Sequence, residues 1–242
     1  MRIRGLFAIA CGVALVAGAA VAAAQTGSSA ASSDLDGLVK VKSKRFDDVY
    51  LRPGADFRGY TRVMFAPTQV TFARNWMKDM NSQPISLRQR TTPESAARIA
   101  EKVRTGFGDA FANAFKSAGY EIVAAPGPDV LNVSLRVIDL YINAPETVTL
   151  SEPSRVYTFD AGEATLALEV RDSTTGALLE RVVDRRTSGD RGSFRSSFMI
   201  TNPVSNRFNF DRLYDLWARS YIKSLEELKA QPVAMNVPAQ KH

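Results

Sequence analysis

TPESAARIAEKVRTGFGDAFANAFKSAG, residues 92–119, predicts a long amphipathic helix that packs against a β-sheet. Thr92 is a suitable N-cap residue, Pro93 fits the first helical position, and Gly119 is suited to ending the helix. Apolar residues recur at steps of three and four and therefore line one face: Val103, Phe107, Ala110, Phe111, Ala114, Phe115 and Ala118.

Strand patterns lie on both sides of this helix. Residues 130–142 alternate apolar and polar side chains, which indicates a half-buried strand, and residues 163–170 repeat the pattern. The turn residues 172–176 then predict a hairpin into a strand over residues 177–185. The other strands are predicted over residues 60–66, 69–72 and 120–124. A short helix is expected around Trp76.

A second amphipathic helix is predicted over residues 211–229. Its inner face is expected to hold Leu213, Leu216, Trp217, Tyr221, Leu225 and Leu228. The fold class that follows is α+β: a mostly antiparallel sheet of about five strands, covered on one face by the two helices.

The first residues have the pattern of an export signal. Arg2 and Arg4 precede an apolar run that ends in Ala22-Ala23-Ala24, so residues 1–24 are expected to be cleaved near Ala24. The alternative is retention of this run as a membrane anchor, because its length approaches that of a membrane-spanning helix. Lipid attachment at Cys11 is not favoured, since the apolar run continues well beyond this residue. The expected location is the periplasm or cell envelope.

Composition divides the remaining chain into three parts. Residues 25–45 are expected to form a flexible tether, because the stretch that follows Ala24 is rich in Ser, Ala and Gly. Residues 46–230 are long enough for a single α+β domain with a substantial core. Residues 231–242 are expected to form a disordered tail.

Several sequence segments resemble those of the family called domain of unknown function 3313. They are DVYLRPGAD at 48–56, GYTRVMFAP at 59–67, AGYEIV at 118–123 leading into PGPDVL at 126–131, and WAR at 217–219. The resemblance covers roughly residues 36–229. It implies an envelope protein, often a lipoprotein in that family, and carries no known activity. The position of Cys11 departs from the lipoprotein pattern.

Most catalytic chemistries have no candidate residues. The chain has one histidine, His242 at the C-terminus, and one cysteine, Cys11 inside the predicted signal. A histidine-based triad, a metal site and a cofactor site are therefore not expected. Carboxylates remain as candidates for hydrolysis or calcium binding: Asp129, Asp139, Glu163, Asp172 and Asp184. Asp139 is notable because it falls on the inward phase of its predicted strand.

The predicted loop over residues 186–206 is the one segment with a local excess of basic residues. Its arginines and apolar side chains are candidates for docking on a partner protein or on anionic lipid. The residues proposed for partner binding are Arg186, Arg191, Phe194, Arg195 and Phe198. The alternative interpretation is a solvated loop whose arginines pair with nearby acids.

The formal net charge of +6 is mild for 242 residues and does not predict nucleic-acid binding, although weak contact with an anionic membrane surface remains possible. The leading hypothesis is a non-catalytic exported envelope protein that binds a partner protein or contributes to envelope assembly or upkeep. The alternatives are a carboxylate-based periplasmic hydrolase and a lipid- or carbohydrate-binding module. The oligomeric state is left open.

Overall fold

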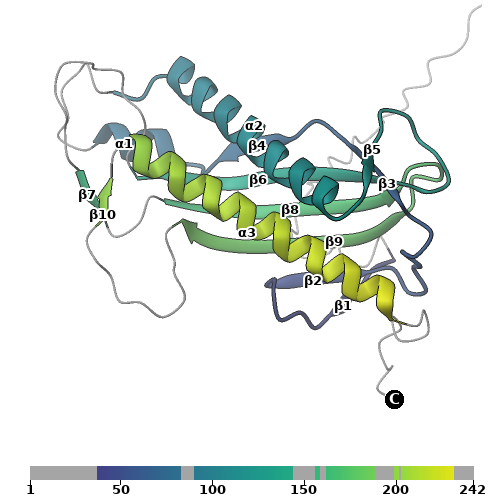
Figure 1. Cartoon of the computed structure of the whole chain (residues 1–242). Helices are drawn as coiled ribbons and strands as arrows, with labels where there is room; N and C mark the ends of the chain where they lie inside the picture. The colour runs from purple at the N-terminus through teal and green to yellow at the C-terminus, as the bar shows by residue number, and fades with distance from the viewer. Residues whose placement is uncertain are drawn as a thin grey trace, which may run out of the picture.

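A computed structural model describes residues 37–82, 90–143, 156–158, 162–188, 199–201 and 203–231. The predicted export signal and nearly all of the predicted C-terminal tail lie outside these residues. The described part is an α+β domain of one large sheet, a two-stranded sheet and three helices (Figure 1).

The large sheet has eight strands. In spatial order they are β1 (Val39–Val41), β2 (Asp48–Leu51), β9 (Leu178–Ser188), β8 (Gly162–Asp172), β6 (Val130–Ile142), β3 (Arg62–Phe65) and β5 (Glu121–Ile122), with β4 (Gln69–Phe72) also beside β6. The small sheet pairs β7 (Val156–Thr158) with β10 (Met199–Thr201). The helices are α1 (Trp76–Ser82), α2 (Pro93–Ser117) and α3 (Pro203–Ala230).

The prediction of a mostly antiparallel sheet of about five strands was wrong. The sheet is mixed, because β3 and β4 both run parallel to β6, and β3 also runs parallel to β5. The physical reason is the long helix α2 between these strands in the sequence. A helical crossover allows the chain to return to the same sheet in the same direction, whereas a tight turn reverses it. The α+β class itself is confirmed.

The sheet begins earlier in the chain than the sequence patterns indicate. Residues 25–45 were assigned to a tether, yet Val39–Val41 forms β1 and pairs antiparallel with β2. Leu38 is buried as well. The alternation of valine and lysine over residues 39–42 is short, and its pairing with β2 supplies the hydrogen bonds that make it a strand.

Helix α2 follows its sequence signals. The Thr92 side chain accepts a hydrogen bond from the Ser95 backbone N–H, and the Ser95 hydroxyl accepts one from the Thr92 N–H, which completes a capping box. Gly119 has a φ of 88° beyond the helix, as a C′ glycine requires. Phe107, Phe111 and Phe115 are fully buried. The predicted inner face of α2 is therefore correct for its large residues.

Helix α3 begins at Pro203, earlier than the predicted residue 211, and so occupies the end of the predicted loop at 186–206. Trp217, Tyr221 and Leu225 are fully buried, as expected. Leu216 is the exception, with 44 % of its surface exposed. The inner face passes instead through Tyr214 and Ala218, because α3 packs against both α2 and β9 and its buried stripe is turned toward α2.

Asp139 does not lie in the core. It is exposed and has a φ of 52°, at a bulge where two residues of β6, Asp139 and Leu140, oppose one residue of β8, Ala164. The extra residue reverses the alternation, so that Leu140 and Ile142 point inward in place of Asp139. The period-2 pattern could not show this, since it assumes an unbroken strand.

Candidate functional site

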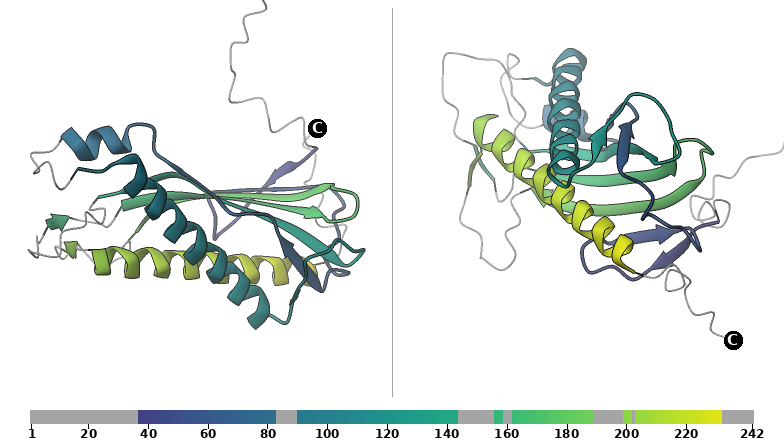
Figure 2. Two further views of the ribbon diagram at one scale, coloured as in Figure 1. Left: turned by 90° about the horizontal axis from the view of Figure 1, so that it is seen from above. Right: turned by 45° about the vertical axis from the view of Figure 1, so that its right-hand side comes forward.

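The two faces of the large sheet differ in what covers them. Helices α2 and α3 pack against one face, where they bury the inward residues of β6, β8 and β9 (Figures 1 and 2). The opposite face carries the polar phase of these strands, including Arg136, Glu169 and Arg181. We call it the open face.

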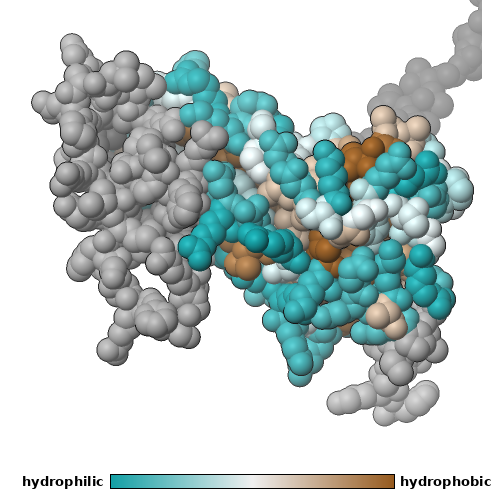
Figure 3. Space-filling view, in the orientation of Figure 1, coloured by the Kyte–Doolittle hydropathy of each residue, from teal (hydrophilic) through white to brown (hydrophobic). Residues whose placement is uncertain are grey.

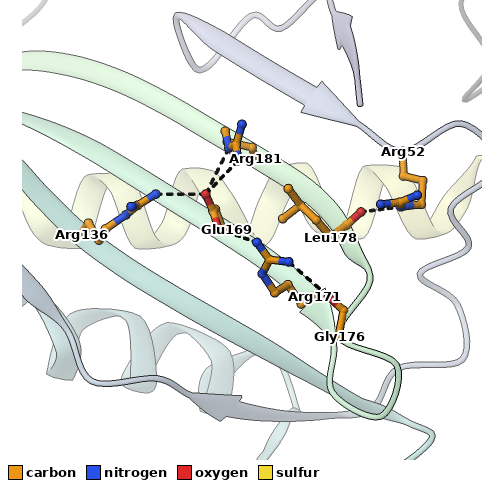
Figure 4. Close-up of polar contacts among 7 residues, drawn as sticks. All are labelled: Arg52, Arg136, Glu169, Arg171, Gly176, Leu178 and Arg181. Carbon is orange, nitrogen blue, oxygen red and sulfur yellow. Dashed lines mark hydrogen bonds and ion pairs between the residues drawn. The ribbon is translucent and has the colours of Figure 1, made fainter. Parts of the chain in front are cut away.

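Three guanidinium groups converge on one carboxylate of the open face (Figure 4). Arg136 Nη2 lies 3.0 Å from Glu169 Oε1, and Arg181 Nη2 lies 3.1 Å from the same oxygen. Arg171 Nη2 lies 3.1 Å from Glu169 Oε2. These four residues, from three adjacent strands, form what we call the arginine cluster. Strand pairing places Glu169 opposite Arg181, while Arg136 reaches it diagonally.

The carboxylate of the arginine cluster is surrounded by three guanidinium groups. Burial raises the pKa of Glu169, but the hydrogen bond from Arg171 and the charges of Arg181 and Arg136 outweigh this and hold the pKa below its usual value. Glu169 is therefore ionised at neutral pH. Three cations share its one negative charge, and each guanidinium carries five N–H donors in a planar fork.

Two buried polar atoms of the open face lack a hydrogen-bond partner within the described residues. They are Nε of Arg136 and Oδ1 of Asn132, which lie on the same face of β6. A buried polar atom without a partner costs free energy unless a water or a ligand satisfies it. Arg136 thus offers an unused donor within the arginine cluster.

The arginine cluster is supported at one end by backbone contacts. Arg171 Nη1 donates to the carbonyl of Gly176 at 3.1 Å, which ties β8 to the turn that follows it (Figure 4). Arg52 Nε donates to the carbonyl of Leu178 at 2.5 Å and holds the end of β2 beside β9. These contacts fix the strands that carry the cluster.

Arg186, one of the residues proposed for partner binding, makes contacts inside the domain. Its Nε donates to Oδ2 of the buried Asp184, and its Nη2 donates to the carbonyl of Arg45 at 2.7 Å. It therefore holds the β1–β2 connection against β9. The other proposed residues, Arg191, Phe194, Arg195 and Phe198, lie outside the described residues, and their role stays a prediction.

The candidate carboxylates Asp129 and Asp172 lie in separate contacts. Asp129 pairs with Arg62, whose hydrogen bond lowers the pKa of the carboxyl to about 2. Asp172 accepts hydrogen bonds from the Tyr60 hydroxyl at 2.7 Å and from backbone N–H groups of its own turn.

Glu163 and Asp139 both lie near Arg185, and the hydrogen bond and charge of Glu163 and the charge of Asp139 raise the pKa of that guanidinium group. Glu163 pairs with Arg185 at 2.5 Å on the surface. Asp184 is buried and accepts a hydrogen bond from Trp217 Nε1 at 2.7 Å. Within the described residues, no three His, Cys, Asp or Glu side chains gather closely enough to hold a metal ion.

A second candidate site lies on the helix side of the molecule, in a groove between α2 and α3. Figure 3 shows a largely hydrophilic surface there, with apolar patches between the helices. A groove of about 450 Å³ runs between α2 and α3, and small side chains such as Ala110, Ala114 and Ala118 line it. Of its charged lining residues Asp215, Arg219 and Lys223, the first two pair with each other at 3.3 Å. The arginine cluster is the stronger candidate because three guanidinium groups converge there on one carboxylate, and the buried Nε of Arg136 has no hydrogen-bond partner within the described residues.

Sequence reasoning missed the arginine cluster. Glu169 and Arg136 were both recognised as outward residues of alternating strands, but nothing in the sequence states that their strands are neighbours. The usable signal was charge of opposite sign at outward positions of consecutive predicted strands. These charges predict contacts only when the register of the sheet is known, because the register decides which outward residues are neighbours.

Comparison with known families identifies the chain. The family model described as "Protein of unknown function (DUF3313)" matches residues 26–220, which is most of the sequence. The chain belongs to the DUF3313 family. The resemblance inferred from the sequence phrases is thereby confirmed, and it brings no established activity. No curated protein matches this DUF3313 member.

Solved structures show only distant likeness to this DUF3313 member. The PelC dodecamer from Paraburkholderia phytofirmans is 11 % identical, with a TM-score of 0.31, over 69 % of this chain and 96 % of that one. Protein XCC0632 from Xanthomonas campestris, described with the family model DUF330, is 11 % identical, with a TM-score of 0.37, over 72 % and 89 %.

The hypothetical protein CT253 from Chlamydia trachomatis is 9 % identical, with a TM-score of 0.32, over 71 % of this chain and 99 % of that one. Likeness at this level carries no argument about function. In the described part of the chain, none of the helices combines the length and apolarity needed to cross a bilayer.

Proposed function

We propose that this DUF3313 member is a non-catalytic exported envelope protein that binds a partner protein through the open face of its sheet. The observation that carries the proposal is the arginine cluster, in which Arg136, Arg171 and Arg181 share the single carboxylate of Glu169. The partner is expected to present acidic side chains to these guanidinium groups.

Arginine is well suited to this role. Its planar fork binds a carboxylate with two parallel hydrogen bonds, and its aliphatic stem packs on a partner surface. Arginine is also enriched among the residues that dominate binding free energy at protein interfaces. Arg136 and Arg171 have 40 % and 37 % of their side-chain surfaces exposed, so a partner can reach them.

The surroundings of the arginine cluster favour a protein over a small anion. Next to it, the register aligns Ile138 with Thr165 and Ala167 with Val183. These uncharged residues lie between Arg136 and Arg185; Thr165 and Ala167 are buried, and Ile138 and Val183 are half-buried. Protein interfaces combine an apolar centre with charged residues at its edge. These uncharged residues beside the arginine cluster match that arrangement.

Export belongs to the proposal and rests on the sequence alone. Arg2, Arg4, the apolar run and the alanines that end at Ala24 support secretion with cleavage near that residue. Cell fractionation with an epitope tag at the C-terminus tests export, and the tagged chain is expected in the envelope fraction. Its intact mass is expected to equal that of a chain whose first residue is Gln25.

The two alternative functions have less support. A lipid-binding module needs space beneath α2, but Phe107 contacts the rings of Tyr214 and Trp217, and Phe111 contacts that of Tyr221. These side chains fill the layer between the helices and the sheet. A hydrolase needs two cooperating carboxylates, and Asp129 and Asp184 are each engaged with different partners.

Cross-linking capture in intact cells tests partner binding. A variant with Arg136→Gln and Arg181→Gln removes two of the three charges and keeps the side chains polar. It is expected to lose most of the cross-linked partner, because charged anchors at an interface cost on the order of 2 kcal/mol or more when removed. A thermal unfolding curve checks that the variant is folded.

The matched control is Arg58→Gln with Arg219→Gln. These arginines are exposed, and each pairs with an aspartate close in sequence. The control is expected to capture the partner as the unaltered chain does. Equal capture by the open-face variant and the control would overturn the proposal.

A further inference from the structure

A second pocket lies on the helix side of the sheet, at the end where β1 and β2 meet the last turns of α3 (Figure 1). Its cavity volume is about 480 Å³, within the range of small-molecule sites. Residues 42–45 of the connection between β1 and β2 form one wall, and Ser224, Glu227 and Gln231 at the end of α3 form the other. We call it the hairpin pocket.

The loop at the hairpin pocket is held in one conformation by its own hydroxyl. Ser43 Oγ accepts hydrogen bonds from the backbone N–H groups of Arg45 and Phe46, both at 3.1 Å. A serine turn of this kind satisfies two backbone donors that would otherwise need water. Lys42 and Lys44, on either side of Ser43, are thereby placed on a rigid loop.

Contacts with α3 and β9 fix the same loop from outside. Arg45 donates two hydrogen bonds of 2.7 Å to the two carboxylate oxygens of Glu227 on α3. The Arg45 carbonyl in turn accepts from Arg186, and the Asp47 N–H donates to Asp184 Oδ1 at 3.0 Å. The pocket wall is therefore pre-organised, which lowers the entropy cost of binding a ligand.

The lining has two chemical parts. The apolar part comes from Val41, Val49, Leu51 and Leu228. The charged part has three cations, Lys42, Lys44 and Arg45, against the one carboxylate of Glu227.

Arg45 already neutralises that carboxylate. Its hydrogen bond lowers the pKa of Glu227, with further lowering by the charges of Lys223 and Lys44. Lys42 and Lys44 are exposed and remain as an excess of two positive charges beside an apolar floor.

We propose that the hairpin pocket binds the phosphate-bearing headgroup of an amphiphile. The ammonium groups of Lys42 and Lys44 contact the phosphate, because a compact ammonium is a good partner for a phosphate oxygen. The Ser224 hydroxyl and the Gln231 amide face the polar part of the headgroup, and the apolar floor takes the first carbons of the chain. This site is separate from the open face and does not depend on the proposed partner.

Titration of the purified full chain tests the site, with binding followed by NMR of ¹⁵N-labelled backbone amides. The probes are a short-chain phosphatidylglycerol below its micelle concentration and free glycerol phosphate. Saturable shifts confined to residues 41–51 and 224–231 are expected. A preference for the lipid supports an amphiphile as the ligand, whereas equal affinity for both probes would contradict the role of the apolar floor and overturn the assignment to an amphiphile.

Two variants separate the site from general charge attraction. Lys42→Gln with Lys44→Gln removes the cations, and Ser224→Phe fills the cavity without a change of charge. Each is expected to weaken binding about tenfold or more, because the lysine variant loses electrostatic complementarity and the Ser224→Phe variant loses steric complementarity.

The control Lys78→Gln with Lys116→Gln removes two lysines from α1 and α2, away from the pocket, and is expected to bind as the unaltered chain does. Absence of saturable binding for both probes overturns the proposal. So does unchanged binding by the Ser224→Phe variant once its thermal unfolding curve shows that it is folded.

Discussion

The Tyr221 hydroxyl on α3 donates a 2.8 Å hydrogen bond to Oε2 of Glu180 on β9, and both side chains are fully buried. The other oxygen of Glu180, Oε1, has no hydrogen-bond partner among the described residues. Burial raises the pKa of Glu180 to about 7, because one hydrogen bond does not offset the loss of water around a carboxylate. The contact between α3 and the sheet therefore includes an acid that is protonated at mildly acidic pH.

Stability is expected to fall as the pH rises through neutrality. The folded-state pKa of Glu180 is about 7 and the ordinary value is 4.5, so the folded chain holds this proton where the unfolded chain releases it. The contribution of Glu180 is complete below pH 4.5 and is lost progressively as the pH rises to about 7. The total is on the order of 3 kcal/mol, at about 1.4 kcal/mol for each pKa unit.

Urea unfolding of the unaltered chain and of Glu180→Gln, at pH 5 and pH 8, measures this effect. The variant is expected to lack the decrease, because its amide stays neutral at both values. The exposed Glu121→Gln serves as control and should retain the decrease. Parallel pH dependence of Glu180→Gln and the unaltered chain would contradict the assignment.

Phe111 is expected to be a major core residue. It is fully buried, with its ring 5.0 Å from that of Phe107 and 6.3 Å from that of Tyr221. Phe111→Ala should lower the free energy of unfolding by about 3–5 kcal/mol, since it leaves a cavity between α2 and α3. Leu216→Ala is the control, and its exposed position predicts a change within about 0.5 kcal/mol. A large loss for Leu216→Ala would contradict the orientation of α3.

Gly162 is expected to resist substitution. Its φ is 137°, and an added Cβ would overlap the Tyr141 carbonyl oxygen. Gly162→Ala should therefore destabilise the chain by about 2 kcal/mol or more, through backbone strain and the forced separation of β8 from β6. Gly59→Ala, which has open space around the new Cβ, should have little effect. Equal thermal unfolding midpoints for both variants would show that β6 can move away.

Glu169 is expected to be necessary for the three arginines to lie together. Glu169→Gln removes the carboxylate that Arg136, Arg171 and Arg181 share, and it should destabilise the chain by about 1–3 kcal/mol at low ionic strength. Added inorganic phosphate should restore part of the loss by neutralising the arginines.

Thermal unfolding with and without phosphate measures the role of Glu169. The exposed pair of Glu101 and Arg104 supplies the control, Glu101→Gln, for which little change is expected. A Glu169→Gln variant as stable as the unaltered chain would show that the arginines disperse without their carboxylate.

Local sequence signals were reliable wherever short-range physics decides the structure. Thr92 caps α2, Gly119 lies beyond its end, and the alternation of residues 131–137 matches the buried and half-buried sides of β6. The sequence segments that resemble the DUF3313 family likewise predicted the family correctly. Each of these depends on neighbours within a few positions along the chain, so the residues themselves contain the information.

Only the tertiary structure decided the features that depend on which strands are neighbours. The parallel pairing of β3 with β6, the outward position of Asp139 at a bulge, and the exposure of Leu216 all follow from contacts between distant segments. The arginine cluster belongs to the same class, since Arg136 meets Glu169 only through the register of β6 on β8. One residue of register shift exchanges the two faces of a strand, and no periodicity in the sequence states where such a shift occurs.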